Sequence, residues 1–182
     1  GCIYVSASLE HPGVLVQHGP ILRVVFGPRD PSYISPILSA IQSDLCESGI
    51  DGVLSTHIQR DALEKFSYVS PIGASGVYLH AVAGDFQKEG PARELFKSMI
   101  REISALAAAM GYPFEKDYVK INLEILSNLS ADATTSMQRD IMEGKPSELD
   151  GLVMEPLRLA KKYSVSMPCY EEVAKVLCPL EF

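Results

Sequence analysis

The hydrophobic positions in the first part of the chain fall in short runs that are rich in β-forming residues and are separated by turn signals. β-forming residues predict three strands, at residues 2–8, 14–18 and 22–26. His11-Pro12-Gly13 predicts a turn after the first strand, and Gly19-Pro20 predicts a break after the second. Apolar residues then recur at helical spacing from Ile34 to Leu45, and Gly49 predicts the end of that helix. This part of the chain is therefore predicted to be β-rich with one amphipathic helix.

From about His57 the pattern becomes almost entirely helical. Apolar periodicity predicts helices at about 57–83, 91–110, 115–128, 134–143, 147–163 and from Cys169 onward. Pro91 suits a first helical turn, and Ser147 ahead of Asp150 is typical of a helix cap. A few short strands and one helix close a hydrophobic core poorly by themselves. The front of the chain is therefore predicted to be the tail end of a larger α/β domain, and an all-helical domain is expected to follow from near residues 54–58.

Composition and charge narrow the class of protein. Of 182 residues, 47% are hydrophobic and 21% are charged, which is typical of a folded globular chain. The net charge of −7 argues against nucleic acid as a partner, because phosphate binding needs clustered Lys and Arg. We expect no membrane span, since no apolar run approaches the length that one needs, and we expect a cytoplasmic location. We expect reduced thiols and no metal site, because the cysteines form no C-x-x-C pair and no histidine cluster lies near them; they are Cys2, Cys46, Cys169 and Cys178.

A lysine on an apolar helical stripe is the first candidate for chemistry. Lys65 lies within the stripe that runs from Ile58 through Phe66 and Val69, not opposite it. A buried ammonium must reach solvent, form an ion pair or serve chemistry, because burying it without a partner is costly. From the residues alone, a lysine that reaches solvent at the helix edge, or that pairs with Glu64 or Asp61, explains the position better than a catalytic role does.

A second candidate region follows residue 134. Ser136 suits a helix start, and Glu148 suits the first turn of the next helix, where the helix dipole favours an acid. These structural roles explain both residues without a function. The sequence shows no Ser-His-Asp arrangement and no G-x-G-x-x-G phosphate-binding turn. The histidines are scattered, at His11, His18, His57 and His80, and we expect none of them to be catalytic.

The residues around these candidates resemble a known family. Residues 135–141 and 144–150 are similar to the S-S-M-x-x-D run and the T-E-I-D-like element of ketopantoate reductases, and Ser136 and Glu148 keep the twelve-residue spacing of that family. Residues 63–66 resemble its W-x-K-L element, which places Lys65 at the catalytic lysine, with Leu63 in place of tryptophan. Residues 163–168 resemble a later H-G-(apolar)-x-x-P turn, although Ser164 replaces the glycine. Residues 1–27 are similar to the last strands of the family's nucleotide-binding domain.

The resemblance implies a fold and a domain organisation. It predicts a mainly α protein, with an all-helical C-terminal domain similar to that of 6-phosphogluconate-dehydrogenase-like enzymes. The last α/β elements of a Rossmann domain are expected to precede it. Residues 1–56 would then be the remnant of the NADP-binding domain, and residues 57–182 the helical domain for substrate binding and dimerisation.

The resemblance also implies a reaction and site residues. NADPH would reduce the ketone of a 2-oxo acid, as in the conversion of ketopantoate to pantoate in pantothenate biosynthesis. Lys65 is then expected to protonate the developing alkoxide, which a nearby cation also stabilises. Ser136 is expected to bind substrate and Glu148 to face the cofactor or substrate. Ala7 matches a position whose backbone lies near the cofactor. A homodimer through the helical domain is the expected assembly.

Because the sequence departs from the family pattern at several positions, it does not identify the substrate. Asparagines that help the family to recognise ketopantoate are replaced by Val69, Gly73 and Ala83. Ser70, next to the first of these, is a candidate to take over part of the substrate binding. Two alternatives to a ketopantoate reductase therefore stand: a reductase of another 2-oxo acid, and a helical dimerisation or ligand-binding module that has lost catalysis. For the last, the apolar segment 100–110 is a candidate dimer surface, although such a segment is more often core.

The glycine fingerprint that binds NADPH is not found in this chain. We therefore expect the missing Rossmann elements to be encoded upstream, and we expect this chain alone to bind NADPH poorly and to be inactive.

Overall fold

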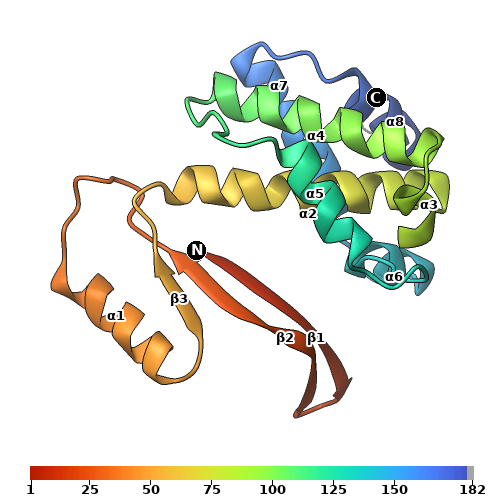
Figure 1. Cartoon of the computed structure of the whole chain (residues 1–182). Coiled ribbons are helices and arrows are strands. Elements are labelled where there is room, and N and C mark those ends of the chain that lie inside the picture. The colour runs from red at the N-terminus through yellow and green to blue at the C-terminus, as the bar shows by residue number, and fades with distance from the viewer. Residues whose placement is uncertain (180–182) are drawn as a thin grey trace. The chain divides into compact units, whose positions relative to one another are not determined.

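The computed structural model describes residues 1–179, which form parts of two compact units. The first unit spans Gly1–Ala62, and the second begins at Leu63. Figure 1 shows strands and one helix in the first unit and helices throughout the second.

The first unit is a three-stranded sheet with one helix. Strands β1 (Cys2–His11) and β2 (Val14–Phe26) form an antiparallel hairpin, and β3 (Asp51–Leu54) lies parallel to β2, in the order β1-β2-β3 (Figure 1). The predicted turn at residues 11–13 is confirmed, and Gly13 has φ +89° there. The sequence did not predict β3, a four-residue strand that contains a glycine.

The predicted break at Gly19-Pro20 is wrong as a strand end but marks a real irregularity. β2 runs through it, yet its pairing with β1 shifts there, since Val5 pairs with Leu22 whereas Ala7 pairs with Gln17. Gly19 has φ +82°, a conformation that glycine adopts easily. The extra residues are therefore accommodated as a bulge within one strand.

Helix α1 (Pro36–Glu47) packs against strand β3 at Gly52. A Cβ at Gly52 would lie 2.9 Å from the Cβ of Leu45, so any larger residue would push the helix away. Gln42 Nε2 also donates a hydrogen bond to the Gly52 carbonyl, at 3.1 Å. Helix α1 and strand β3 can thus approach each other this closely only because residue 52 is a glycine.

The buried core of the first unit is small. Within the described residues its core cluster consists of Cys2, Val25 and Ile58. Many large apolar side chains of this unit are exposed, among them Ile3, Val5, Leu9, Leu15, Ile21, Ile34 and Ile37. So little burial agrees with the expectation that the sheet and helix do not close a core by themselves.

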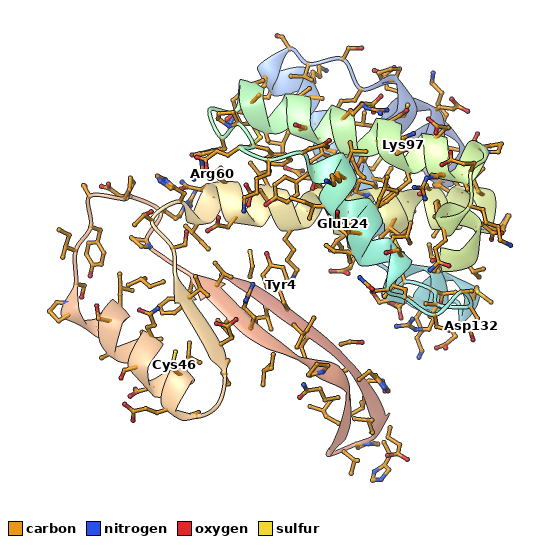
Figure 2. All side chains as sticks on the ribbon, in the orientation of Figure 1. Tyr4, Cys46, Arg60, Lys97, Glu124 and Asp132 are labelled. Atoms are coloured by element: carbon orange, nitrogen blue, oxygen red, sulfur yellow. The ribbon has the colours of Figure 1, made fainter. Side chains whose placement is uncertain are left out.

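The second unit is helical throughout its described residues. Its helices are α2 (Ile58–Leu79, whose first residues belong to the first unit), α3 (Ala83–Gln87), α4 (Pro91–Ala109), α5 (Tyr118–Ser127), α6 (Ser136–Met142), the π-helical turn η1 (Asp150–Met154), α7 (Glu155–Tyr163) and α8 (Pro168–Leu177). Side chains between α2, α4 and α5 fill its interior (Figure 2). Within residues 1–179, no helix combines the length and the hydropathy that crossing a bilayer demands.

Two details of the predicted helices are wrong, and the expected helix start at Ser136 is found. The helix expected at 57–83 ends at Leu79, His80 takes a left-handed conformation with φ +51°, and the short α3 follows separately. Ser147 does not cap the next helix, because the π-helical turn begins at Asp150 without a side-chain cap. Thr135 is the cap of α6, in a capping box with Gln138, so Ser136 is not needed to cap that helix.

Helix α2 contains a proline whose missing N–H is compensated by another helix. Pro71 cannot donate to the Ser67 carbonyl one turn earlier. Instead, Asn122 Nδ2 of α5 donates to that carbonyl at 3.0 Å and to the Ser67 hydroxyl at 3.1 Å. All three residues lie in the buried interior. The carbonyl that Pro71 leaves without a helical partner thus connects α2 to α5 by a hydrogen bond.

The N-terminus of α8 is capped by a side chain from α4. The buried Glu102 carboxylate accepts hydrogen bonds from the backbone N–H groups of Cys169, at 2.8 Å, and Tyr170, at 3.1 Å. These are two of the N–H groups that a helix leaves without partners at its start. A residue of α4 thereby replaces a local cap.

Candidate active site

Lys65 lies in the first half of α2 and is half-buried. It shares one side of the helix with Val69 and Gly73, which follow it at intervals of four residues. Eight residues of α-helix span about 12 Å, so Gly73 lies about two turns further along. The face of α2 that begins at Lys65 therefore extends toward Gly73.

Two other segments meet this face at Gly73. A Cβ on Gly73 would lie 3.1 Å from Met137 Cε and 3.8 Å from Leu152 Cδ1. Met137 directly follows Ser136, and Leu152 lies four residues after Glu148. The structure thus brings the segments that carry the predicted serine and glutamate to the side of α2 on which the lysine lies.

Ser136 is the first residue of α6 and is exposed. Because Thr135 supplies the cap, the Ser136 hydroxyl makes no hydrogen bond with the described residues 1–179. The helix itself is held by Gln138, whose Nε2 donates to the Ala81 carbonyl at 2.8 Å, while a Cβ at Gly76 would lie 2.8 Å from its amide. The anchoring of α6 therefore leaves the serine hydroxyl open to a ligand.

Glu148 is exposed and precedes the π-helical turn η1. Within the part of the chain that the structure describes, its carboxylate makes no hydrogen bond or ion pair, while its carbonyl accepts from the Leu152 N–H at 2.9 Å. The start of η1 is fixed by Asp150, which accepts two hydrogen bonds from Arg158, at 2.7 and 3.0 Å. The guanidinium lowers the pKa of Asp150 and keeps that carboxylate charged. π-helical turns are rare and are found frequently at functional sites.

Ser70 lies in the interior, and its hydroxyl already makes hydrogen bonds within the protein. Its hydroxyl donates to the Leu152 carbonyl at 2.6 Å and shares a 2.5 Å hydrogen bond with the Tyr170 hydroxyl. Pro156 lacks the N–H that would otherwise serve the Leu152 carbonyl, which explains why a side chain can take its place. Burial raises the pKa of Tyr170, so its hydroxyl stays neutral. The sequence did not predict this network, although Pro156 inside a helical pattern signalled a carbonyl in need of a partner.

Ala7 lies on β1, in the first unit, and is exposed. It pairs with Gln17 directly after the irregularity in the ladder between β1 and β2. Ala7 itself is paired in the ladder, and the contact expected between its backbone and a cofactor stays a prediction.

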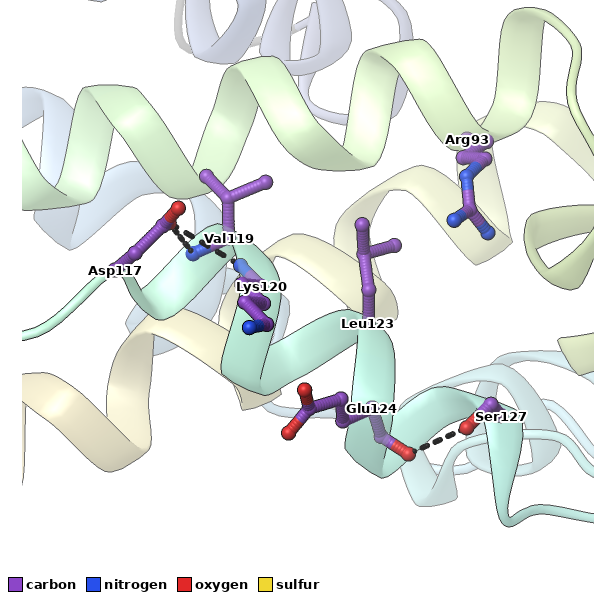
Figure 3. Close-up of a pocket in the computed structure, with 7 residues that line it drawn as sticks. All are labelled: Arg93, Asp117, Val119, Lys120, Leu123, Glu124 and Ser127. Atoms are coloured by element: carbon purple, nitrogen blue, oxygen red, sulfur yellow. Dashed lines mark hydrogen bonds between the residues drawn. The ribbon is translucent and has the colours of Figure 1, made fainter.

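A shallow pocket of about 440 Å³ lies between α4 and the exposed side of α5 (Figure 3). Its lining contains none of the predicted site residues and consists of Arg93, Asp117, Val119, Lys120, Leu123, Glu124 and Ser127. Arg93 already donates to the carbonyls of Phe86 and Gln87, both at 3.1 Å, and Asp117 caps α5. Arg93 and Asp117, two of the four charged residues of the lining, thus serve the fold. Among residues 1–179, no group of three or more His, Cys, Asp or Glu side chains is arranged to hold a metal ion.

Comparison with known families decides the classification. A family model described as "Ketopantoate reductase PanE/ApbA C terminal" matches residues 57–181. The chain belongs to the ketopantoate reductase family. The resemblance of residues 135–150 to that family's motifs is thereby confirmed at the level of the family.

The curated proteins that this chain matches are distant from it in sequence. The uncharacterized oxidoreductase YkpB of Bacillus subtilis is 21% identical over 95% of this chain and 57% of its own length. A 2-dehydropantoate 2-reductase of Aquifex aeolicus is 26% identical over 85% of this chain and 51% of its own length. The chain thus spans about half the length of the curated relatives it matches.

Similar solved structures confirm the fold. A 2-dehydropantoate 2-reductase from Methylococcus capsulatus superposes with a TM-score of 0.84 at 22% identity, over 98% of this chain and 56% of the other. D-mandelate dehydrogenase, solved with NADH and anilino(oxo)acetate, superposes with a TM-score of 0.79 at 18% identity, over 96% of this chain and 57% of the other. The expected fold class is therefore confirmed: a helical C-terminal domain preceded by Rossmann-like elements.

Proposed function

We propose that this chain is the C-terminal part of an NADPH-dependent reductase of 2-oxo acids of the ketopantoate type. The main support is the family match over residues 57–181, together with the packing of the Ser136 and Glu148 segments on the Lys65 side of α2. In this proposal residues 57–182 bind substrate and pair into a homodimer. Residues 1–56 belong to the nucleotide-binding domain of a cytoplasmic enzyme. The small core and exposed apolar side chains of the first unit support that part of the proposal.

The described residues fit a nucleotide cofactor only in part. The exposed carboxylate of Glu148 can accept a hydrogen bond from a ribose or an amide, and the backbone near Ala7 lies beside a bulge. The sequence contains no G-x-G-x-x-G phosphate cradle. We propose that the phosphate site lies in the half of the relatives' length that this chain does not cover.

The chemistry proposed for this chain's own residues is proton transfer and substrate orientation. When bound, NADPH supplies the hydride that reduces the ketone carbon. The Lys65 ammonium stabilises the negative charge that develops on the ketone oxygen and then gives that oxygen its proton, so that a 2-hydroxy acid forms. A proton from water restores the ammonium. Ser136 orients the substrate by a hydrogen bond from its open hydroxyl.

Ser70 is assigned a structural role in this proposal. Its hydroxyl is fully buried, and its one donor is already used by the Leu152 carbonyl while it shares a second hydrogen bond with Tyr170. It holds α2 against η1 and α8 instead.

A second candidate function is the reduction of a different 2-oxo acid. D-mandelate dehydrogenase shares this fold and was solved with NADH, so the family fold accommodates other substrates and the other nicotinamide cofactor. The residues Val69, Gly73 and Ala83, which replace the asparagines expected for ketopantoate, favour this alternative. A catalytically inactive dimerisation or ligand-binding module is the third.

The test is turnover by the full-length enzyme that contains this chain. NADPH and NADH oxidation is measured with ketopantoate and with a panel of other 2-oxo acids. Lys65→Ala is expected to lower kcat by roughly 10²- to 10⁴-fold. Lys97→Ala, which removes a lysine paired with Glu94 on α4, serves as the matched control and should leave kcat unchanged. Full activity in Lys65→Ala would exclude the lysine as proton donor, and the absence of turnover with every acid would favour the inactive module.

The chain alone provides a separate test of the missing phosphate site. We expect NADPH titrated into the 182-residue chain to show no saturable binding and the chain to turn over no substrate. A clear single-site titration would contradict this part of the proposal.

A further inference from the structure

A buried hydroxyl, that of Ser70, links the two segments that carry Lys65 and Glu148. Ser70 lies on α2, five residues after Lys65, and is fully buried. Its hydroxyl donates to the Leu152 carbonyl of η1 at 2.6 Å. The Leu152 N–H in turn donates to the Glu148 carbonyl at 2.9 Å. Two successive hydrogen bonds therefore connect the helix of the lysine to the backbone of the glutamate.

The direction of these bonds follows from the protons that the groups possess. A serine hydroxyl has one proton, and the Leu152 carbonyl can only accept, so the Ser70 proton is used there. The Tyr170 hydroxyl must then donate to the Ser70 oxygen in the 2.5 Å hydrogen bond between them. The two hydroxyls thus have different roles, because Ser70 connects α2 to η1 whereas Tyr170 supports Ser70 from α8.

The contact between η1 and α2 is fixed at two places. The Leu152 carbonyl depends on Ser70 because Pro156 has no N–H to offer it. Three residues further along α2, a Cβ at Gly73 would lie 3.8 Å from Leu152 Cδ1. Apolar packing is not directional, whereas a hydrogen bond is, so the hydroxyl is what sets the register of η1 on α2.

The place of the Glu148 side chain depends on this turn. Its carboxylate is exposed and makes no hydrogen bond or ion pair with residues 1–179, so its backbone and the turn that follows determine where it lies. Groups that act on one substrate must be held in a precise mutual geometry, and a displacement of about 1 Å can lower a rate by about 100-fold. A change in the register of η1 would therefore move Glu148 relative to Lys65.

We propose that Ser70 is a positioning residue, which sets Glu148 relative to Lys65 through the Leu152 carbonyl. This inference rests on the proposed reductase function and adds to it a residue that acts on the site from the interior. Loss of the hydroxyl is expected to lower kcat/KM by roughly 10- to 100-fold. Because the hydroxyl acts through Glu148, its loss should have little effect once that carboxylate is absent.

A double-mutant cycle tests this dependence in the full-length enzyme. kcat/KM is measured with ketopantoate, or with the 2-oxo acid that the enzyme reduces fastest, for the original enzyme, Ser70→Ala, Glu148→Ala and the double variant. Ser70→Ala should cost no more than about twofold in the Glu148→Ala background. Independent, multiplicative effects would overturn the inference. So would an unchanged kcat/KM in either single variant.

Tyr170→Phe separates positioning from general destabilisation. It removes the other buried hydroxyl of the network, and it should lower the midpoint of urea unfolding. It leaves the hydrogen bond between Ser70 and Leu152 in place, so kcat/KM should stay within about twofold of the original value. Equal losses of kcat/KM in Tyr170→Phe and Ser70→Ala would assign both hydroxyls to stability alone.

Pro156→Ala provides a second separation, and it is used if Ser70→Ala alone does not fold. The N–H that this substitution restores can serve the Leu152 carbonyl, but it does not tie η1 to α2. Ser70→Ala combined with Pro156→Ala should therefore regain part of its stability while kcat/KM stays low. A recovery of kcat/KM together with stability would exclude a positioning role.

Lys65→Ala keeps the failure of this inference apart from the failure of the proposed function. If turnover is lost in Lys65→Ala but is unchanged in Ser70→Ala, the positioning role is wrong and the reductase function stands. If the full-length enzyme reduces no 2-oxo acid, the reductase function is wrong and this inference falls with it.

Discussion

Ser70 of α2 and Tyr170 of α8 share a buried hydrogen bond of 2.5 Å, although one hundred residues separate them in sequence. The same serine donates to the Leu152 carbonyl of η1 at 2.6 Å. One hydroxyl thus joins the helix that carries Lys65 to the turn that follows Glu148. Since Pro156 provides no N–H for that carbonyl, the network replaces a helical hydrogen bond by a tertiary one.

Removal of this hydroxyl should be costly. Ser70→Ala leaves a buried carbonyl and a buried tyrosine hydroxyl with lost partners, and we expect it to lower the free energy of unfolding by about 1–3 kcal/mol. Urea unfolding of the chain, followed by circular dichroism at 222 nm, measures the change. Ser75→Ala is the matched control, because Ser75 is equally buried but donates at 2.5 Å to the Pro71 carbonyl of its own helix, which has a helical partner as well. Equal losses in the two variants would argue against the tertiary network.

The bond between Asn122 and the Ser67 carbonyl should depend on Pro71. We expect Asn122→Ala to lower the free energy of unfolding by about 1–3 kcal/mol, because the carbonyl that the proline leaves free loses its partner. In a Pro71→Ala background a helical N–H can serve that carbonyl, so the same substitution should cost less. The double-mutant cycle measures the coupling, and additive effects of the two substitutions would contradict the explanation. Asn128→Ala, which removes an exposed asparagine bonded to its own helix, controls for the loss of an amide.

Ser164 occupies a position that favours glycine. It ends α7 in a left-handed conformation with φ +58° and ψ 43°. A residue with a Cβ is strained there by about 1 kcal/mol relative to glycine. Ser164→Gly is therefore expected to raise the midpoint of thermal unfolding. Ser166→Gly, at a nearby exposed position without positive φ, should not raise it.

Cys169 should react slowly and should make stability fall in alkaline solution. Burial, together with the neighbouring Glu102 carboxylate, raises the pKa of its thiol from 9.0 to about 11. At pH 8 we expect iodoacetamide to alkylate the exposed Cys46 well before Cys169, as peptide mass analysis would show. Because the folded state holds this proton more tightly, the contribution of the thiol is fully present below pH 9 and is lost as the pH rises toward 11.

Two variants isolate this alkaline effect. The decline of the unfolding free energy between pH 9 and 11 should be smaller in Cys169→Ala than in the original chain. Cys46→Ala should show the original decline. A decline that is the same in all three proteins would assign the alkaline sensitivity to other groups.

Local patterns predicted most of the helices but few of their junctions. Apolar periodicity predicted helices near the observed α4, α5 and α7, because each buries one side against its neighbours. The short β3 escaped prediction, since four residues with a glycine carry little periodicity. The ends of α6 and α8 depend on the capping box of Thr135 and on Glu102, and only the first of these is local in sequence.

For the candidate site, too, some features were predicted from local sequence and others were not. Lys65, Ser136 and Glu148 were predicted from short motifs, and their catalytic and binding roles remain predictions. The packing of Gly73 against Met137 and Leu152 was not predictable, because it joins segments more than sixty residues apart. Likewise, no local signal showed that Ser70 bonds to Tyr170 rather than facing a ligand.

The contact of the Glu102 carboxylate with the start of α8 has a consequence for the order in which the helices form during folding. Because the first turn of α8 has its N–H groups satisfied by a residue of α4, a peptide of residues 168–177 alone lacks that support and has too few residues to be helical by itself. Helix α8 should therefore form late in folding, by docking onto an α4 that already exists. Conversely, in a chain synthesised only as far as residue 167, the Glu102 carboxylate would lack its two N–H donors. The ten residues of α8 complete the hydrophobic core of the second unit once they are added.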